Sequence, residues 1–156
     1  MKSRFIASLA VGAAIVLGTT GCSMLSTQAT TIPYSPADGV NVADSGPLKV
    51  RNALIVANED GTVGNFVAAI VNETSEPQTL HLEANDGAIA ETVRVPANST
   101  VSLGGDGNRP LRLEGIDTKP GADLDMYFQS GDASGVLATV PVLDGTLDYL
   151  TALAPR

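Results

Sequence analysis

Short β-type runs separated by turn residues fill the chain from residue 47 onward, and this pattern constrains the fold more than any other feature. Runs rich in Val, Ile, Leu and Thr recur roughly every ten residues, as they do in antiparallel β-sandwiches. None of them keeps the period of about 3.6 residues that an amphipathic helix needs. The sequence therefore predicts an all-β, antiparallel, immunoglobulin-like β-sandwich with strands at 48–57, 65–72, 78–84, 88–95, 100–103, 111–113, 124–128 and 135–142.

The length of 156 residues suggests one domain with extensions at its ends. We assign the β-sandwich to residues 47–143, and a domain of about this size buries roughly two-thirds of its surface in one core. Residues 22–46 are rich in Ser, Thr, Ala and Pro, and we interpret them as a flexible, lipidated tether that spans roughly 25–30 Å. Residues 144–156 could form a short helix or a frayed strand, and we assign them as a C-terminal tail.

Residues 1–21 have the plan of a secretory signal peptide, with a basic start, a short apolar run and small residues before the only cysteine, Cys22. The uncharged run Phe5–Leu17 would span about 20 Å as a helix, which is too short for a bilayer core of about 30 Å. A signal that ends directly before Cys22 resembles the lipobox of bacterial lipoproteins, in which this cysteine is acylated. We therefore expect a protein anchored by lipid at the outer face of the cell membrane. A soluble secreted protein with a chance cysteine here is the alternative.

The acidic charge of the chain limits its partners. The net charge is −8, and removal of Lys2 and Arg4 with the signal peptide would bring it to −10. Nucleic-acid binding needs a basic surface, so we exclude nucleic acid as a partner. The same charge repels anionic lipid headgroups, so we expect the domain to stand away from the membrane that its lipid enters.

Candidate catalytic groups are few. The single histidine, His81, lies in an alternating strand between Leu80 and Leu82, and this position predicts an imidazole that points away from the core. The sequence contains no Gly-x-Ser-x-Gly nucleophile motif. The glycine-rich stretch 104–108 lacks the Lys-Ser/Thr pair of a phosphate-binding loop. We therefore predict no enzymatic activity and no cofactor.

Metal binding is limited by the same scarcity of ligands. One Cys and one His exclude zinc fingers and internal disulfides, and no dense run of acidic residues forms a calcium loop. A soft copper site needs clustered Met and His, and the mature chain retains only Met24, in the tether, together with His81 and Met126. His81 and Met126 are the weak candidates for such a site, although Met126 is more typical of a strand residue that packs inward.

The stretch before the first strand contains two prolines and a tyrosine in a chain with only three Tyr and three Phe. We interpret it as a docking segment for a partner, with Tyr34, Pro36, Asp38 and Asn41 as the candidate contact residues. The alternative is that Tyr34 packs against the edge of its own domain.

Four stretches of the sequence resemble actinobacterial lipoproteins of the LpqE type: Gly21–Cys22, Tyr34–Asn41, Val50–Val56 and Ala69–Pro77. The resemblance covers nearly the whole mature chain. It implies a cupredoxin-like β-sandwich, since these lipoproteins are distant relatives of periplasmic copper chaperones. The chaperone pattern requires two His and two Met at set spacings, and this chain lacks it.

The resemblance also implies a partner. Lipoproteins similar to this chain are accessory subunits at the outer face of the actinobacterial cytochrome bcc–aa3 respiratory supercomplex. We therefore expect a non-enzymatic accessory or docking subunit that acylated Cys22 holds to the membrane. The alternatives are a copper-chaperone-like metal-binding module that uses His81 and Met126, and a lipoprotein that binds an envelope ligand.

Overall fold

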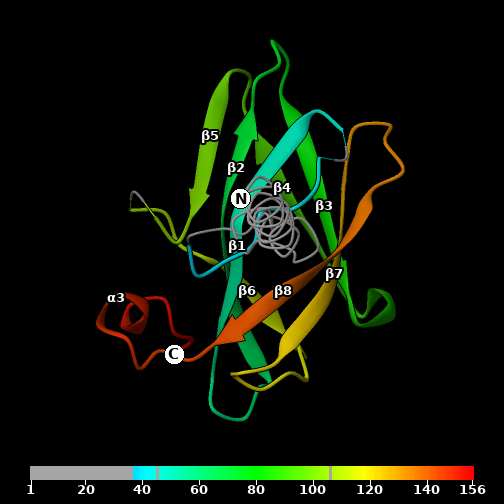
Figure 1. Ribbon diagram of the computed structural model, residues 1–156. Helices are drawn as coiled ribbons and strands as arrows, with labels where there is room; N and C mark the ends of the chain where they lie inside the picture. The colour runs from blue at the N-terminus through cyan, green and yellow to red at the C-terminus, as the bar shows by residue number, and fades with distance from the viewer. Residues whose placement is uncertain (1–36, 45, 106) are drawn as a thin grey trace, which may run out of the picture. The chain divides into compact units, whose positions relative to one another are not determined.

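The computed structural model describes residues 37–44, 46–105 and 107–156, so the predicted signal peptide, Cys22, Tyr34 and Pro36 lie outside the described residues. The described ranges contain eight strands at all the predicted places, which confirms the all-β prediction (Figure 1). No helix within them is long and apolar enough to span a membrane. The elements are β1 (Leu48–Ala57), β2 (Val63–Asn72), β3 (Gln78–Ala84), η2 (Asn85–Gly87), β4 (Ile89–Val95), β5 (Ser99–Leu103), β6 (Leu111–Glu114), β7 (Asp123–Ser130), β8 (Val136–Leu143) and α3 (Asp148–Thr151).

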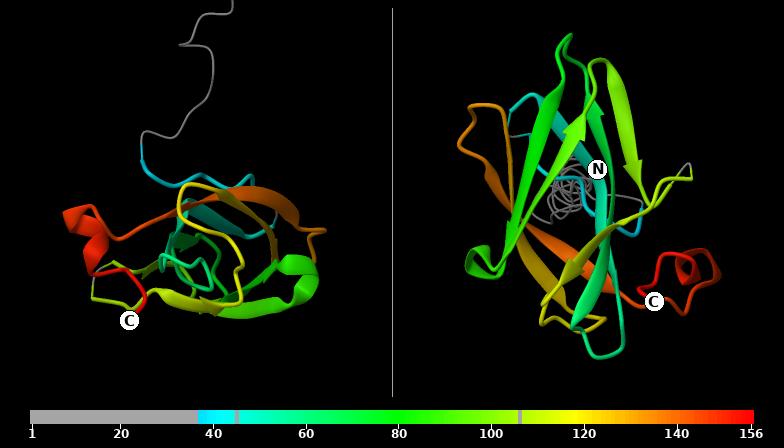
Figure 2. Two further views of the ribbon diagram at one scale, coloured as in Figure 1. Left: turned by 90° about the horizontal axis from the view of Figure 1, so that it is seen from below. Right: turned by 180° about the vertical axis from the view of Figure 1, so that it is seen from behind.

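The strands form two layers that β8 connects. The strand order is β4-β3-β7-β8-β1-β2-β5, and β6 pairs with β2 beside this path. β8 changes its partner along its length, because it pairs with β7 from Val136 to Pro141 and with β1 at Val142 and Leu143. In Figures 1 and 2, β8 (orange) accordingly runs diagonally across the other strands.

The pairing of β1 with β8 is parallel, which corrects the expectation of a wholly antiparallel sandwich. Turn residues indicate which consecutive strands form hairpins, and these pairs are antiparallel as expected. β1 and β8 are the first and last strands, and parallel pairing needs a crossover connection instead of a tight turn. The sheet is therefore mixed. No local signal in the sequence indicates the direction of a pair between such distant strands.

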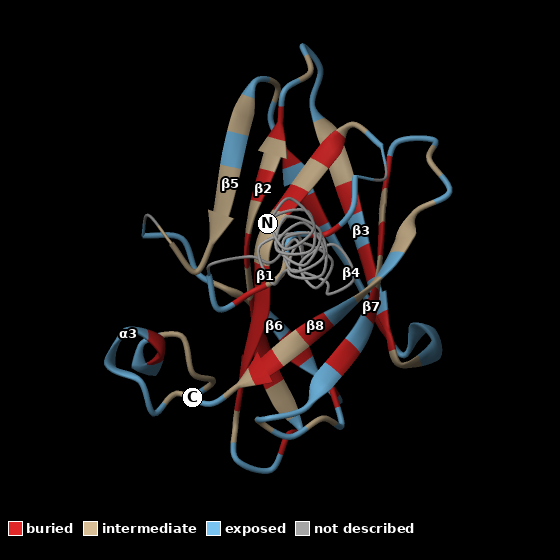
Figure 3. Ribbon diagram, viewed as in Figure 1, coloured by how far each residue is buried: buried red, intermediate tan, exposed pale blue. Residues whose placement is uncertain are grey.

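The core lies between the two layers and takes alternate side chains from the strands (Figure 3). Phe66 of β2 and Phe128 of β7 meet there, with ring centroids 6.1 Å apart. Each large apolar side chain that leaves water in this way contributes roughly 1.5–3 kcal/mol to folding. Among the described residues, no buried side-chain nitrogen or oxygen lacks a hydrogen-bond partner.

The last residues of the chain cover the outer face of β1. Leu54 and Val56 point away from the main core and form a second apolar cluster with Leu150 of α3. The Nδ2 group of Asn65 fastens this region by donating a hydrogen bond of 2.7 Å to the carbonyl oxygen of Leu153. The stretch that we expected to be a tail is therefore packed, because the end of β1 is apolar on both faces and needs cover on each.

Residues 37–44, here called the N-terminal arm, lie along β1 although we assigned them to the tether. Val40 and Ala53 exchange two backbone hydrogen bonds of 2.9 and 2.7 Å. The N–H of Val42 donates to the carbonyl oxygen of Val50 at 3.1 Å, and the side chain of Val42 is buried in the main core. The packed domain therefore begins before residue 47, because Val40 and Val42 bond to the backbone of β1 and Val42 adds a buried side chain.

Candidate functional site

The two candidate copper ligands lie on opposite faces of neighbouring strands. His81 of β3 is exposed, whereas Met126 of β7 is 0% exposed and belongs to the main core. The β3–β7 register pairs His81 with Gln129 and pairs Met126 with Ala84. Both side chains have the orientation that alternation predicts, and this orientation keeps the imidazole and the thioether from meeting at one ion. No group of three or more His, Cys, Asp or Glu residues suited to a metal ion occurs in the described ranges.

Two of the four candidate docking residues lie within the described part, and both make contacts inside the domain. Oδ1 of Asn41 accepts a hydrogen bond of 3.1 Å from the backbone N–H of Asn52. In α3, hydrogen bonding to the nearby carboxylate of Asp38 is the main cause that raises the pKa of Tyr149. The N-terminal arm is therefore bonded to β1, and its Asp38 lies near the C-terminal helix.

Charged groups near the arm and near α3 have lowered pKa values. Nη2 of Arg51 donates to Oδ1 of Asp44 at 2.7 Å, and this hydrogen bond lowers the pKa of Asp44. Oδ1 of Asp144 accepts hydrogen bonds from the hydroxyl (2.6 Å) and the N–H (3.1 Å) of Thr146, and these lower the pKa of Asp144. Both carboxylates are exposed, and their bonds serve the structure: Asp144 stabilises the turn to Thr146, and Asp44 joins the end of the arm to Arg51 of β1.

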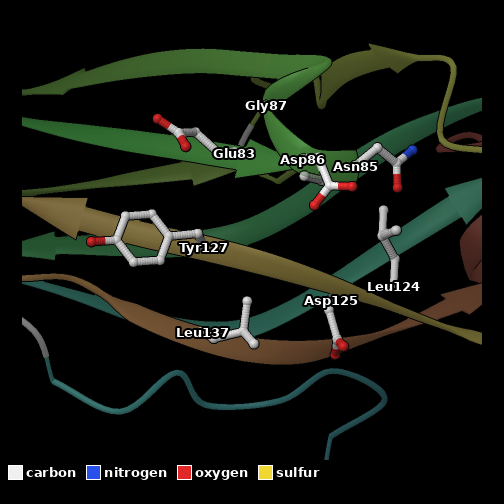
Figure 4. Close-up of a pocket in the computed structure, with 9 residues that line it drawn as sticks. Glu83, Asn85, Asp86, Gly87, Leu124, Asp125, Tyr127 and Leu137 are labelled. Carbon is white, nitrogen blue, oxygen red and sulfur yellow. The ribbon is translucent and has the colours of Figure 1, made fainter.

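An open hollow of about 530 Å³ lies on the outer face of the sheet beside β7 and β8 (Figure 4). Tyr127 is one of its lining residues, and it pairs with Glu83 of β3 on one side and with Leu137 of β8 on the other. We call it the β7–β8 hollow and define it by its lining residues, which are Glu83, Ala84, Asn85, Asp86, Gly87, Leu124, Asp125, Tyr127 and Leu137.

None of the residues of the β7–β8 hollow is predicted as a site residue from the sequence. The alternation in residues 78–84 and 124–128 predicts which side chains leave the core, and it places Glu83, Asp125 and Tyr127 outside. What brings these side chains together is the pairing of β3 with β7, and these two strands are far apart in the sequence. No turn or motif signals that pairing.

Comparisons with known proteins give likenesses in structure only. No family model matches the chain, and no curated protein matches it in sequence. The apo PCuAC domain of PmoF2 superposes with a TM-score of 0.51 at 18% identity, over 67% of this chain and 95% of that one. The copper-bound PCuAC domain of PmoF2 gives a TM-score of 0.50 at 18% identity, over 67% of this chain and 97% of that one. The apo PCuAC domain of PmoF1 gives a TM-score of 0.48 at 22% identity, over 64% of this chain and 96% of that one.

The two likenesses to PmoF2 concern the fold. Each covers nearly the whole of the PCuAC domain and about two-thirds of this chain, and the described residues form a mixed β-sheet folded into two layers. The prediction of a cupredoxin-like β-sandwich is therefore confirmed, and the described β-domain has the fold of these PCuAC domains.

Proposed function

We propose that the chain is a non-enzymatic, lipid-anchored domain at the outer face of the cell membrane, and that it acts by docking onto a membrane protein complex. The observation that carries the proposal is the separation of His81 from Met126 on a PCuAC-like fold. Within the described residues, the only imidazole and the only thioether point to opposite faces of the sheet. A domain of this kind can bind a partner through its surface without holding a metal or supplying a reacting group.

The proposed partner is the cytochrome bcc–aa3 supercomplex of actinobacteria. The resemblance to lipoproteins of the LpqE type supports this choice, and the acidic charge is compatible with a position outside the membrane. The test is affinity purification of the lipidated protein from gently solubilised membranes, followed by mass spectrometry. We expect subunits of cytochromes bcc and aa3 at close to one copy per copy of this chain. A protein that purifies alone would overturn the docking function.

The proposed anchor is Cys22, which lies outside the described residues, so its support comes from the sequence. Replacing Cys22 by Ala removes the sulfur that would be acylated. We expect the variant to leave the membrane fraction and to lack the acyl mass at its N-terminus, whereas Ser23→Ala, the matched change at the next residue, keeps both. A Cys22→Ala protein that stays membrane-bound at full yield would contradict the anchor.

A copper-chaperone-like module is the second candidate function, and the likeness to a copper-bound PCuAC domain favours it. In this chain it would have to use His81 with a donor other than Met126, because these two side chains lie on opposite faces. Competition between the full chain and a Cu(I) chelator separates the two candidates. Binding tighter than micromolar that disappears in His81→Asn would establish the copper module. Its absence in the wild type supports the docking domain.

A further inference from the structure

The β7–β8 hollow presents an apolar side chain to solvent without cover. Leu137 is 64% exposed, the largest value for a large apolar residue in the described part of the chain. It pairs with Tyr127, which in turn pairs with Glu83, so the three side chains form a row across β8, β7 and β3 (Figure 4). Exposed single leucines are common on protein surfaces, but this one lies in a hollow beside an aromatic ring.

The walls of the hollow are held in place by hydrogen bonds. The hydroxyl of Tyr127 donates to the carbonyl oxygen of Ser134, so one end of the ring is fixed. Nδ2 of Asn85 donates to the carbonyl oxygens of Gly115 (2.8 Å) and Ile116 (3.0 Å), which fastens the η2 turn to the loop after β6. A partner would therefore meet a surface that needs little ordering on binding.

The charge around the hollow has a single sign. Glu83, Asp86 and Asp125 line it, and no Lys or Arg is among its lining residues. Asp125 is oriented by the hydroxyl of Thr139, which donates to its Oδ1 at 2.7 Å. The three carboxylates form no group suited to a metal ion, so the charge favours a cationic side chain over an ion.

We propose that the β7–β8 hollow docks an arginine side chain presented by a basic partner protein. The inference rests on the proposed docking function and names the surface and the partner chemistry. The aliphatic stem of an arginine covers Leu137, its guanidinium lies near the ring of Tyr127, and its N–H groups reach Glu83 or Asp125. Anionic partners such as nucleic acid or acidic lipid headgroups are repelled by the same carboxylates.

The test uses the full lipidated chain in a neutral detergent and a capped triarginine peptide that carries a fluorophore. Fluorescence anisotropy at low ionic strength measures the affinity. The matched probe is the same peptide with citrulline, which keeps the shape of arginine and removes its charge. Circular dichroism and the midpoint of chemical unfolding show that each variant is folded.

Two variants alter the hollow and one serves as a control. Glu83→Gln/Asp125→Asn removes two charges, and we expect binding to weaken about tenfold, or about 1.4 kcal/mol. Leu137→Thr introduces a residue that favours strands and removes the apolar contact, and we expect binding to weaken roughly threefold. Asp60→Asn/Glu76→Gln removes the same charge from exposed positions that do not line the hollow, and we expect its affinity to stay within about twofold of the wild type.

The outcomes separate the hollow from general charge attraction. Equal losses in the hollow and control double variants would overturn the proposal, because the acidic surface as a whole would then bind the peptide. Binding that Leu137→Thr leaves unchanged, or equal binding of the citrulline peptide, would overturn it as well.

Membrane purification of the same variants distinguishes this inference from the docking function itself. If the wild type retains its partners and the two hollow variants retain them equally, docking holds and this surface is the wrong one. If the wild type purifies alone, the docking function fails whatever the peptide result. Loss of partners in the hollow variants, with the control variant unchanged, supports both the docking function and the β7–β8 hollow as its surface.

Discussion

The backbone N–H of Gly39 donates to Oδ1 of Asn52 at 2.8 Å, and this bond joins the N-terminal arm to β1. Asn52 has a left-handed backbone with a φ of 52°, and the β1–β2 ladder shifts its register between Arg51 and Leu54. The N–H of Asn52 in turn donates to Oδ1 of Asn41 at 3.1 Å. The two asparagines therefore bridge the arm to β1 at the place where the regular ladder is interrupted.

Asn52→Ala should destabilise the domain by roughly 1–3 kcal/mol, because alanine loses the bond to Gly39 and is strained at positive φ. Asn52→Gly is the matched variant, since glycine also loses the bond but adopts positive φ freely. We expect the midpoint of chemical unfolding to fall further for Ala than for Gly. Equal midpoints for the wild type and both variants would show that this junction contributes nothing to stability.

Asn72 at the end of β2 is a buried asparagine, and it should matter more than Asn52. It is 1% exposed, and its Nδ2 group donates to the carbonyl oxygens of Glu76 (2.9 Å), Val95 (3.2 Å) and Pro96 (2.9 Å). Asn72→Ala leaves these carbonyls without that donor, so we expect a loss of about 3 kcal/mol in unfolding free energy.

The control for Asn72 is Ser99→Ala. The hydroxyl of Ser99 donates to the same carbonyl oxygen of Pro96 at 2.8 Å, but this bond is exposed, so its loss should cost only about 1 kcal/mol. Urea denaturation followed by circular dichroism compares the two variants. A larger loss for Ser99→Ala than for Asn72→Ala would contradict the central role of Asn72.

Strand positions could be predicted from the sequence because the spacing of buried side chains is a local property. In β3, Leu80 and Leu82 are buried and His81 is exposed, as alternation requires. The inward position of Met126 follows from the same rule. The scarcity of His, Cys and Met could also be read directly, since it depends only on which residues the chain contains.

The features that could not be predicted depend on contacts between distant parts of the chain. The parallel pairing of β1 with β8 joins the two ends of the domain, and no turn reports on it. Val42 and Leu150 pack against faces of β1 that exist only once the sheet has assembled. For the same reason the β7–β8 hollow could not be foreseen, because its side chains come from β3, η2, β7 and β8.

The C-terminal residues should contribute to stability as a part of the domain. Leu150 is 3% exposed and covers Leu54 and Val56, so Leu150→Ala should cost about 2–3 kcal/mol in unfolding free energy. Leu147→Ala is the matched control in the same segment, because Leu147 is half exposed, and its effect should stay within about 0.5 kcal/mol. Similar, small effects of both variants on the unfolding midpoint would mean that α3 adds little to the fold.

The bond between Tyr149 and Asp38 predicts a change at alkaline pH. The hydrogen bond from the Tyr149 hydroxyl to the Asp38 carboxylate is the main cause of the raised pKa of Tyr149, and the negative charge of Asp38 adds to it. The protonated phenol is thus favoured in the folded state. Its contribution to stability is present below the pKa of an unfolded tyrosine, near 10, and is lost as the pH rises through the higher pKa of the folded state.

An ultraviolet titration of the tyrosines measures this effect. Subtracting the curve of Tyr149→Phe from that of the wild type isolates Tyr149 from Tyr34 and Tyr127. Asp38→Asn removes the charge and weakens the acceptor, so we expect the pKa of Tyr149 to fall toward its ordinary value. Asp148→Asn changes an exposed carboxylate next to Tyr149 in sequence and should leave that pKa nearly unchanged. If the two asparagine variants shift the titration equally, general surface charge and not the bond to Asp38 sets the pKa of Tyr149, and the link between the N-terminal arm and α3 is not formed in solution.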